Sequence, residues 1–516
     1  MLVDDHDRTD PRPLGLRYWM ERVLEEIERA SRDFAPDPVH DLRVALRRCR
    51  SLARGFMAVD SDKAWKALQE EDQRLFRRLG KLRDVQVSKD AVLRLGSPED
   101  PVSVAMLHHL GRREQELKLA ALKALKTFDR EEWRRWIARL HTRTRRLPAG
   151  DPVFQLNALQ AWTEAYGLHK LAMRDRSAAA YHRLRIGIKK FRYVVENFLP
   201  LRHAEWGGDL KQIQDCLGEA QDFRVLWEMI LGLQPPPDPA GKERWRALIA
   251  EEQAGRVGLY RAKMVGGNSL WPVWRRGLPP PDRLRPLSLA TMEKWGYFHG
   301  IDLARARRVR RLALRVYDGL RRAGQTAGDD VPEQRAVLHL AATLHELSRT
   351  KDRKRDSSTA VRLLRGLPPL PGFSPEMLQQ TAFVIHGHRG RFWDFEGHEL
   401  AALPEEQRQS VMRLAGALRL ARALARGGGL TVKSVRLDPA GDAIVMRVKG
   451  YEEFGPMAEK LARARCHLEY ACHRPIIVRS DPVGRGESPE MRDRAVTETG
   501  QARKPRDDRL SGTDEA

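Results

Sequence analysis

The sequence predicts a mainly α-helical protein: a duplicated helical-bundle domain, a second helical domain with a small α/β cap, and a disordered tail. Amphipathic segments with apolar residues every three or four positions fill most of the first 428 residues. One basic helical pattern occurs twice within them. With 516 residues, 41% of them hydrophobic, the chain is long enough for two or three domains with buried cores.

The first copy of the basic pattern is the segment VHDLRVALRRCRSLARGF, residues 39–56. Steps of three and four residues place five of its basic side chains, all except that of Arg48, on one helical face about 20 Å long. No acidic residue follows Asp41 before Asp60, and like charges at this spacing repel each other. The pattern therefore predicts an anionic partner. We call the following residues the first basic row: His40, Arg43, Arg47, Arg48, Arg50 and Arg54.

The second copy is YHRLRIGIKKFRYVVENF, residues 181–198, shifted by 142 positions. A further matching pair of segments follows the two copies: LGKLRDVQV at 79–87 and LGEAQDFRV at 217–225. A duplicated helical unit explains both pairs, and two such units could face one cavity. Glu196 occupies the position of Arg54, so the second row is shorter. The second basic row consists of His182, Arg185, Lys189, Lys190 and Arg192.

The repeated pattern His-x-x-Arg-x-x-x-Arg/Lys-Arg/Lys-x-Arg, with Leu-Gly and Asp downstream of each copy, resembles the CHAD domain, the conserved histidine α-helical domain. The resemblance covers residues 12–272. It implies two pseudo-symmetric four-helix bundles around a basic pore that binds inorganic polyphosphate. It also implies that the residues of both basic rows are the phosphate contacts.

The charge of the chain agrees with a polyanionic partner. Lys and Arg number 93 against 70 Asp and Glu, which gives a formal net charge of +23. Arginine suits phosphate because its planar guanidinium donates two hydrogen bonds to two oxygens. Nucleic acid is an alternative partner that we do not favour: no common nucleic-acid-binding module is recognisable, and the rows have few interleaved aromatics beyond Phe191 and Tyr193.

Proline and glycine mark the expected boundaries of the remaining chain. The Pro-rich stretch at 276–287 predicts a linker, and residues 288–428 again show helical periodicity. Residues 429–480 predict a small α/β cap, with strands in LTVKSVRLDP, AIVMRVKG and PIIV and a helix in GPMAEKLARARCHLEYAC. Residues 481–516 are polar and aperiodic, which predicts a disordered tail.

The segments ARRVRRLAL, LHLAATLHELS, LPGFSPE and AFVIHGHRGRF resemble the helical HD-type domain of the exopolyphosphatase and guanosine pentaphosphate phosphatase (Ppx/GppA) family. The resemblance covers residues 288–480. In that family, hydrolysis is attributed to an actin-like ATPase-fold domain that precedes the helical one. In this chain the CHAD-like domain occupies that place.

A working HD site needs His and Asp ligands for metal ions that activate water. In this chain Arg305 falls on the first metal His, Arg422 on the final Asp, and Asp356, Ser357 and Ser358 on the later His cluster. We therefore expect a degenerate, catalytically inactive HD domain and no cofactor. The weak metal candidates that remain are His345, Glu346 and His388.

These observations predict non-catalytic binding of inorganic polyphosphate through two basic helical rows that line a pore or groove. No catalytic residue is assigned. The first alternative is a metal-dependent phosphohydrolase acting on polyphosphate or a guanosine tetraphosphate-like nucleotide. The second alternative is a nucleic-acid-binding protein. Chain-length preference and association with polyphosphate granules stay open.

The cysteines and the N-terminal segment bear on location. Four cysteines in a chain of this size do not indicate a disulfide framework. The spacing of Cys466 and Cys472 is not a usual zinc spacing. No run of 18 apolar residues exists, and the N-terminal residues do not resemble a signal peptide. We therefore expect a cytoplasmic protein that does not associate with membranes.

Overall fold

The computed structural model describes residues 15–325, 331–347, 369–389, 399–426 and 434–481, with residues 364, 366, 367 and 432. As predicted, these residues are mainly helical and include one small sheet near the C-terminus. They divide into two compact units. The first lies within Met1–Arg307 and Pro332–His386, and the second within Arg308–Val331 and Gly387–Ala516. The tail expected to be disordered, from residue 482 onward, lies outside the described residues.

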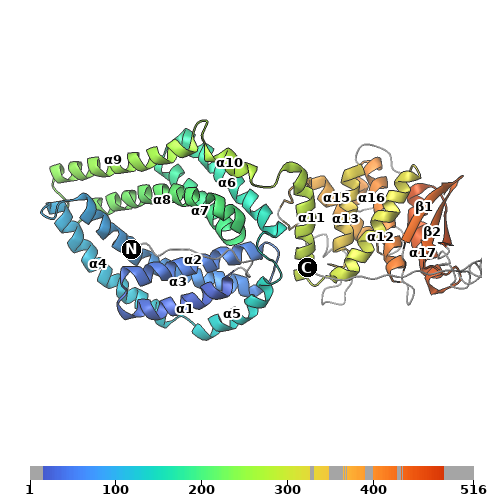
Figure 1. Ribbon diagram of the computed structural model, residues 1–516, viewed down its shortest axis with the longest axis horizontal. Helices are drawn as coiled ribbons and strands as arrows, with labels where there is room; N and C mark the ends of the chain where they lie inside the picture. The colour runs from blue at the N-terminus through green and yellow to red at the C-terminus, as the bar shows by residue number, and fades with distance from the viewer. Residues whose placement is uncertain are drawn as a thin grey trace, which may run out of the picture. The chain divides into compact units, whose positions relative to one another are not determined.

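The first unit contains two consecutive four-helix repeats (Figure 1). The helices of the first repeat are α1 (Leu16–Asp33), α2 (Pro36–Met57), α3 (Lys63–Leu95) and α4 (Pro101–Lys126). A further helix, α5 (Arg130–Thr144), joins it to the second repeat. The helices of the second repeat are α6 (Pro152–Asp175), α7 (Ala178–Phe198), α8 (Pro200–Leu231) and α9 (Pro239–Met264), followed by α10 (Leu270–Arg276).

The last helices of the two repeats, α4 and α9, begin with the same local chemistry. The N-cap carboxylates of α4 and α9, Asp100 and Asp238, each accept a hydrogen bond of 3.0 Å from the backbone N–H three residues later. Proline follows each cap at the first helical position, where its missing N–H costs nothing. Both helices are 26 residues long. The likeness of the repeats therefore extends to the N-caps of α4 and α9.

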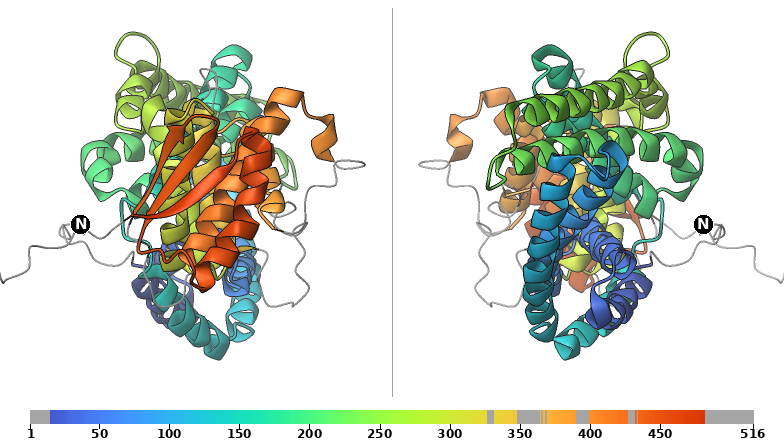
Figure 2. Two further views of the ribbon diagram at one scale, coloured as in Figure 1. Left: turned by 90° about the vertical axis from the view of Figure 1, so that its right-hand side faces the viewer. Right: turned by 90° about the vertical axis from the view of Figure 1, so that its left-hand side faces the viewer.

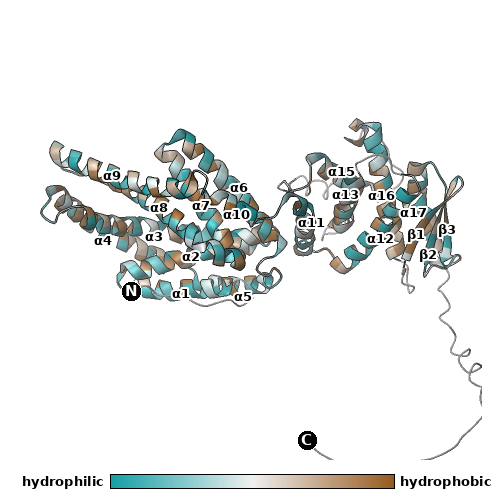
Figure 3. Cartoon of the chain, turned by 45° about the horizontal axis from the view of Figure 1, so that its top comes forward, coloured by the Kyte–Doolittle hydropathy of each residue, from teal (hydrophilic) through white to brown (hydrophobic). Residues whose placement is uncertain are grey.

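The two repeats meet where α2 packs against α7 and α3 packs against α8. Gly55 on α2 marks a close approach, because a Cβ there would lie 2.3 Å from the ring of Phe198 on α7. Phe198 in turn stacks on Phe154 of α6 with ring centroids 4.0 Å apart. Colouring by hydropathy shows apolar and polar residues alternating around these helices (Figure 3). The basic rows on α2 and α7 thus belong to neighbouring helices.

The Pro-rich stretch at 276–287 differs from the expected linker. Helix α11 (Pro281–Phe298) begins inside it, and only the residues before Pro281 connect α10 to α11. Pro281 is the first residue of α11, a position that proline favours. Pro286 lies within the helix, which tolerates the loss of one backbone hydrogen bond there. Proline here starts a helix instead of preventing one.

The helices that follow α11 in the chain belong to both units. They are α12 (Leu303–Arg322), α13 (Val331–Leu344), α15 (Pro375–Gly387), the short 3₁₀ helix η2 (Glu399–Ala402) and α16 (Glu405–Ala425). The helical periodicity expected at 288–428 is thus present in the described part of that segment.

The second unit contains the sheet predicted near the C-terminus. Strands β1 (Ser434–Ala440) and β2 (Ala443–Lys449) are antiparallel, and β3 (Ile476–Asp481) pairs with β2 in parallel. Helix α17 (Pro456–Cys472) connects β2 to β3 and packs against α16, as Figure 2 shows. Alternate residues such as Leu437, Ile444 and Met446 are buried. The two-residue turn between β1 and β2 contains Gly441, whose φ is +58°.

The sequence predicted no membrane-spanning helix and no disulfide framework. In the part of the chain that the structure describes, no helix is both long and apolar enough to span a membrane. All four cysteines are described, and none forms a disulfide. Three are buried, and Cys466 is exposed.

Candidate functional site between the two repeats

The two basic rows lie close enough for their charges to act on each other. Lys189 belongs to the second row on α7, and its pKa is lowered to about 7. Burial is the largest cause, followed by the charges of Arg47, Arg185, Arg43 and Arg50 in that order. Three of these arginines come from the first row on α2. The rows therefore converge on a shared cluster of positive charge.

Helix α3 provides a platform for Arg43 on the first row. Burial lowers the pKa of Arg43 to about 10, and the charge of Arg47 contributes. The guanidinium of Arg43 lies 4.3 Å from the ring centroid of Phe76 and donates to the Phe76 carbonyl at 3.3 Å. A Cβ at Gly80, one turn later on α3, would lie 2.9 Å from Nη1 of Arg43. The glycine thus leaves room for the guanidinium.

Five cationic members of the rows form no ion pair within the described residues. They are Arg43, Arg47, Arg54, Arg185 and Lys189. Burial lowers the pKa of Arg47 and, together with the charge of Arg50, that of Arg54. The buried Nε of Arg47 also lacks a hydrogen-bond acceptor. Their positive charge is available to an external anion.

Arg50 and its counterpart in the second row, Arg192, each face a carboxylate. Arg50 Nε donates to Oδ2 of Asp72 on α3 at 2.6 Å. Asp72 is fully buried, and this burial raises its pKa to about 7 although the charge of Arg50 acts in the opposite direction. Arg192 Nε lies 3.6 Å from Oε2 of Glu196. Both arginines are thus partly neutralised from within the protein.

Arg48 and Lys190, which occupy equivalent positions, also have internal partners. Arg48 forms an ion pair with Glu196 and donates to Oδ1 of Asn197 at 2.9 Å. Lys190 forms an ion pair with Glu164 on α6. Arg48 links the two repeats, whereas Lys190 links α7 to α6 within the second repeat. Neither side chain is a free cation.

The two histidines of the rows face equivalent positions on α3 and α8. Burial lowers the pKa of His40, and neighbouring arginines, including Arg83 on α3, lower it further. The lowered pKa favours the neutral form of the His40 imidazole. His182 Nδ1 accepts from the side-chain amide of Gln221 at 3.0 Å, and the amide oxygen accepts from Arg224. Gln221 is the counterpart of Arg83 in the matching segments.

Asp84 and Asp222 are site residues that the sequence reasoning did not assign. They are the Asp shared by the two matching segments on α3 and α8. Burial raises the pKa of Asp84, and it raises that of Asp222 to about 6. The charge of Arg185 acts on both carboxyl groups, and Asp84 acts on Asp222. The repeat of this Asp in both matching segments could have identified the two residues, but it indicated only that the helical unit is duplicated.

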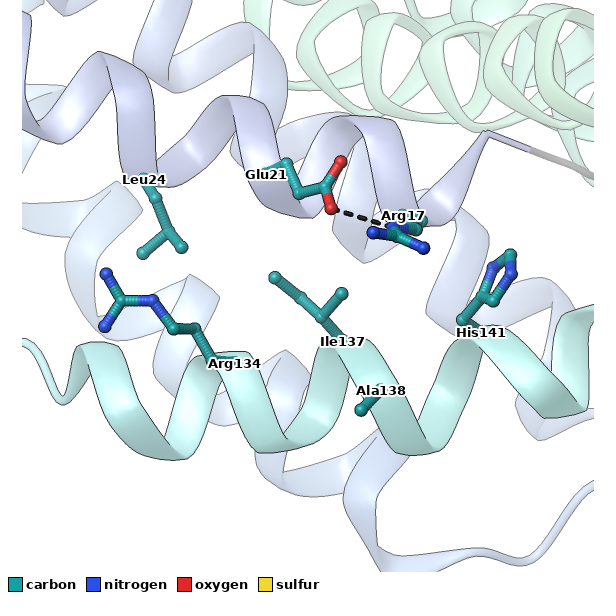
Figure 4. Close-up of a pocket in the computed structure, with 7 residues that line it drawn as sticks. All are labelled: Arg17, Glu21, Leu24, Arg134, Ile137, Ala138 and His141. Carbon is teal, nitrogen blue, oxygen red and sulfur yellow. Dashed lines mark hydrogen bonds and ion pairs between the residues drawn. The ribbon is translucent and has the colours of Figure 1, made fainter.

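A pocket elsewhere in the first repeat contains no member of the basic rows. It lies between α1 and α5, with Leu24, Ile137 and Ala138 forming its apolar part (Figure 4). Arg17 Nε donates to Glu21 at 2.8 Å beside it. The remaining lining residues are Arg134 and His141.

Two of the weak metal candidates lie in the turn directly after α13. His345 and Glu346 are both buried, and His345 Nδ1 lies 2.8 Å from the carbonyl oxygen of Ala342. Glu346 Oε1 lies 3.3 Å from Nε of Arg305. Arg305 is the residue that the family resemblance places at a metal-binding His. The guanidinium therefore supplies a positive charge next to Glu346 without a metal.

The third candidate, His388, is buried, and its Nε2 accepts from Nε of Arg389 at 3.2 Å. That contact occupies the lone pair with which Nε2 would bind a metal. Among the described residues, no three His, Cys, Asp or Glu side chains are grouped so that they could hold a metal ion. The expected substitutions Asp356, Ser357 and Ser358 lie outside the described residues.

Comparison with known families agrees with both resemblances. Residues 16–231 match the family model described as the CHAD domain, and residues 288–446 match Ppx/GppA phosphatase, domain III. The chain therefore contains a CHAD domain followed by a Ppx/GppA domain III. Among solved structures it is similar to the CHAD domain from the plant Ricinus communis, with 24% identity and a TM-score of 0.39 over 49% of this chain and 89% of that one. The two families together indicate a polyphosphate-related function.

Proposed function

We propose that this protein binds inorganic polyphosphate without hydrolysing it, by electrostatic capture between the first and second basic rows. The observation that carries this proposal is the convergence of the rows: Lys189 on α7 lies within the field of Arg43, Arg47 and Arg50 on α2. Cations placed together in this way raise the free energy of the empty site. A chain of phosphates supplies the missing negative charges at regular spacing.

The internal partners divide the rows into two roles. The side chains that form no ion pair are proposed as the main phosphate contacts, together with the two histidines. The cations among them are Arg43, Arg47, Arg54, Arg185 and Lys189. Arg48, Arg50, Lys190 and Arg192 have carboxylate neighbours and are proposed to position the helices and add to the field.

A recess between the rows is supported by side chains that are both exposed and incompletely solvated. His40, Arg54, Asp84 and Asp222 are exposed to solvent, yet the surrounding protein shifts the pKa of each toward the neutral form. A convex surface does not desolvate the groups it exposes, whereas the wall of a groove or pore does. A polyphosphate chain entering such a recess loses water and gains arginine contacts.

The binding interpretation is preferred over hydrolysis because of Arg305. Its guanidinium lies against Glu346, one of the residues that a metal-dependent mechanism would need. A positive charge at that position opposes a bound cation. The Ppx/GppA-type domain is proposed to act as a scaffold or as a second contact for partners.

The experiment that tests this proposal is a titration with long-chain polyphosphate and with double-stranded DNA, at low and near-physiological salt. Phosphate release is followed in the same samples with Mg²⁺ and Mn²⁺. We expect polyphosphate binding to weaken with salt because each contact releases a counterion, yet to outlast DNA binding, with no phosphate released. Metal-dependent release would indicate a phosphohydrolase, and equal loss of both ligands with salt would indicate a basic surface without preference.

A further inference from the structure

The sheet of the second unit has one face packed against helices, while side chains on its other face are exposed (Figure 1). On the packed face, a Cβ at Gly319 of α12 would lie 2.8 Å from Cβ of Leu437. Successive side chains of a strand point to opposite faces, so the neighbour of Leu437, Arg436, belongs to the exposed face. The side chains of Arg436, Arg447 and Arg479 are 72%, 51% and 58% exposed.

These three residues form one line across the sheet, which we call the arginine row: Arg436, Arg447 and Arg479. Arg447 on β2 is paired with Arg436 on β1 and with Arg479 on β3. Neighbouring strands lie about 4.8 Å apart, so the row spans about 10 Å. Like charges directly opposite each other on adjacent strands are destabilising. An anionic partner that offsets this repulsion must carry charges over the same length, which a single phosphate ion does not.

The carboxylates beside the arginine row do not neutralise it. Arg436 Nε donates to Oδ1 of Asp438 at 3.0 Å, and Arg447 Nε lies 3.9 Å from Oδ2 of the same carboxylate. Arg479 Nη1 lies 3.6 Å from Oε2 of Glu453. Ion pairs this exposed contribute little to stability. Three guanidinium groups thus share two weakly held carboxylates, and phosphate groups can replace them.

The next line of residues across the same face is partly apolar. Val445 on β2 is paired with Ile477 on β3 and with Asp438 on β1. Ile477 is exposed, and Val445 is half-buried. Phe454, which follows Glu453 in the chain, is fully exposed. Inorganic polyphosphate has no apolar part that could contact these side chains, whereas the bases of a single-stranded nucleic acid do.

We propose that this face of the sheet binds single-stranded RNA, with phosphates on the arginine row and bases on Val445 and Ile477. Residues two positions apart along a strand are separated by about 7 Å, so the two lines lie side by side. Arginine suits the phosphates because it donates two hydrogen bonds, and Phe454 offers a ring on which a base can stack.

RNA fits this face better than a polyanion without hydrogen-bond donors. Asp438 lies in the same line as Val445 and Ile477, and its carboxylate can accept from a ribose 2′-hydroxyl or from a base amino group. An acidic polypeptide would instead bring further carboxylates to Asp438. The site lies in the second unit, and it does not depend on the basic rows of the first.

The test measures the affinity of the full chain for a fluorescent single-stranded RNA of about 12 nucleotides by anisotropy. Every chain also carries Arg47→Glu and Lys189→Glu, so that the basic rows do not hold the RNA. Arg447→Gln removes the centre of the arginine row, and we expect affinity to fall about 10-fold, with a salt dependence that is lower by about one counterion. The control is Arg463→Gln on α17, where the exposed Arg463 pairs with Glu459. Equal RNA affinities in these two variants would overturn the inference.

A second variant separates base contacts from charge. Ile477→Ser changes an exposed side chain without changing the net charge, and we expect RNA affinity to fall by about threefold or more. Single-stranded DNA of the same sequence should bind severalfold more weakly, and polyglutamate at equal charge should not displace the RNA. Unchanged affinity in Ile477→Ser, equal binding of DNA, or displacement by polyglutamate would each contradict RNA as the partner. Long-chain polyphosphate titration of Arg447→Gln with intact basic rows should match the wild type, which keeps this test separate from the proposed function.

Discussion

Arg48 on α2 and Glu196 on α7 form an ion pair that joins the two repeats. The side chains are only 15% and 7% exposed. Glu196 is the one position where the second basic pattern departs from the first, with a carboxylate in place of the arginine found at residue 54. The departure shortens the second row, and it also supplies the counter-charge that holds the two rows together.

Removing this carboxylate should destabilise the fold. Glu196→Gln leaves Arg48 and the nearby Arg192 without their buried partner, and we expect a loss of about 3 kcal/mol in the free energy of unfolding. Urea denaturation followed by circular dichroism measures it. The matched control is Glu70→Gln, whose partner Lys66 is exposed and whose effect should stay within about 0.5 kcal/mol. Equal urea midpoints for the two variants would contradict the structural role of Glu196.

Charge reversal in both rows should abolish the shared positive cluster. Arg47→Glu combined with Lys189→Glu turns two unpaired cations into carboxylates next to Arg43 and Arg185. We expect polyphosphate affinity at low salt to fall by about 100-fold or more, with helical content retained. Arg135→Glu combined with Lys66→Glu changes the charge equally on exposed surfaces and should have a small effect. Similar losses in both double variants would show that net charge alone determines binding.

The sequence predicted the helices and the rows because both depend on local spacing. The steps between His40 and Arg54 determine one helical face, and the shift of 142 residues repeats that face. The same holds for the sheet, where alternation around residues 434–449 predicted two paired strands. Local spacing is enough to predict these features, because they do not depend on which elements pack together. The structure contains them as predicted.

The partners of individual side chains could not be predicted in the same way. Asp72 lies in an ordinary amphipathic segment, and only the packing of α3 on α2 brings it to Arg50. Lys190 has the spacing of a row member, yet its ion pair with Glu164 depends on α6. Pro281 looked like part of a linker, but its position at the start of α11 is decided by the residues that follow.

The site should bind polyphosphate more tightly as the pH falls. Lys189 gains a proton near its lowered pKa of about 7, and Asp222 loses its negative charge near its raised pKa of about 6. Both changes make the site more positive, so we expect affinity to increase by about tenfold between pH 8 and pH 5.5. Isothermal titration at constant ionic strength measures this dependence.

Two variants measure how much Lys189 and Asp222 each contribute to the pH dependence of the affinity. Lys189→Met should reduce the part near pH 7, because its side chain does not titrate, and leave the contribution of Asp72, which pairs with Arg50 and whose pKa is also about 7. Asp222→Asn should remove the part near pH 6 and strengthen binding at pH 8, where the carboxylate is otherwise charged. A wild-type affinity that stays constant from pH 8 to pH 5.5 would show that neither group lies at the phosphate site.

Two equivalent glycines provide the sharpest test of the role of Arg43. Gly80 on α3 and Gly218 on α8 both lie inside helices, where alanine is favoured over glycine by about 1 kcal/mol. At Gly218 a Cβ meets open space, whereas at Gly80 it lies 2.9 Å from Nη1 of Arg43.

Gly218→Ala should therefore stabilise the protein and leave polyphosphate affinity unchanged. Gly80→Ala should displace the Arg43 guanidinium from Phe76 and weaken binding by about three- to tenfold without unfolding the chain. Equal affinities in the two alanine variants would place Arg43 outside the phosphate contacts.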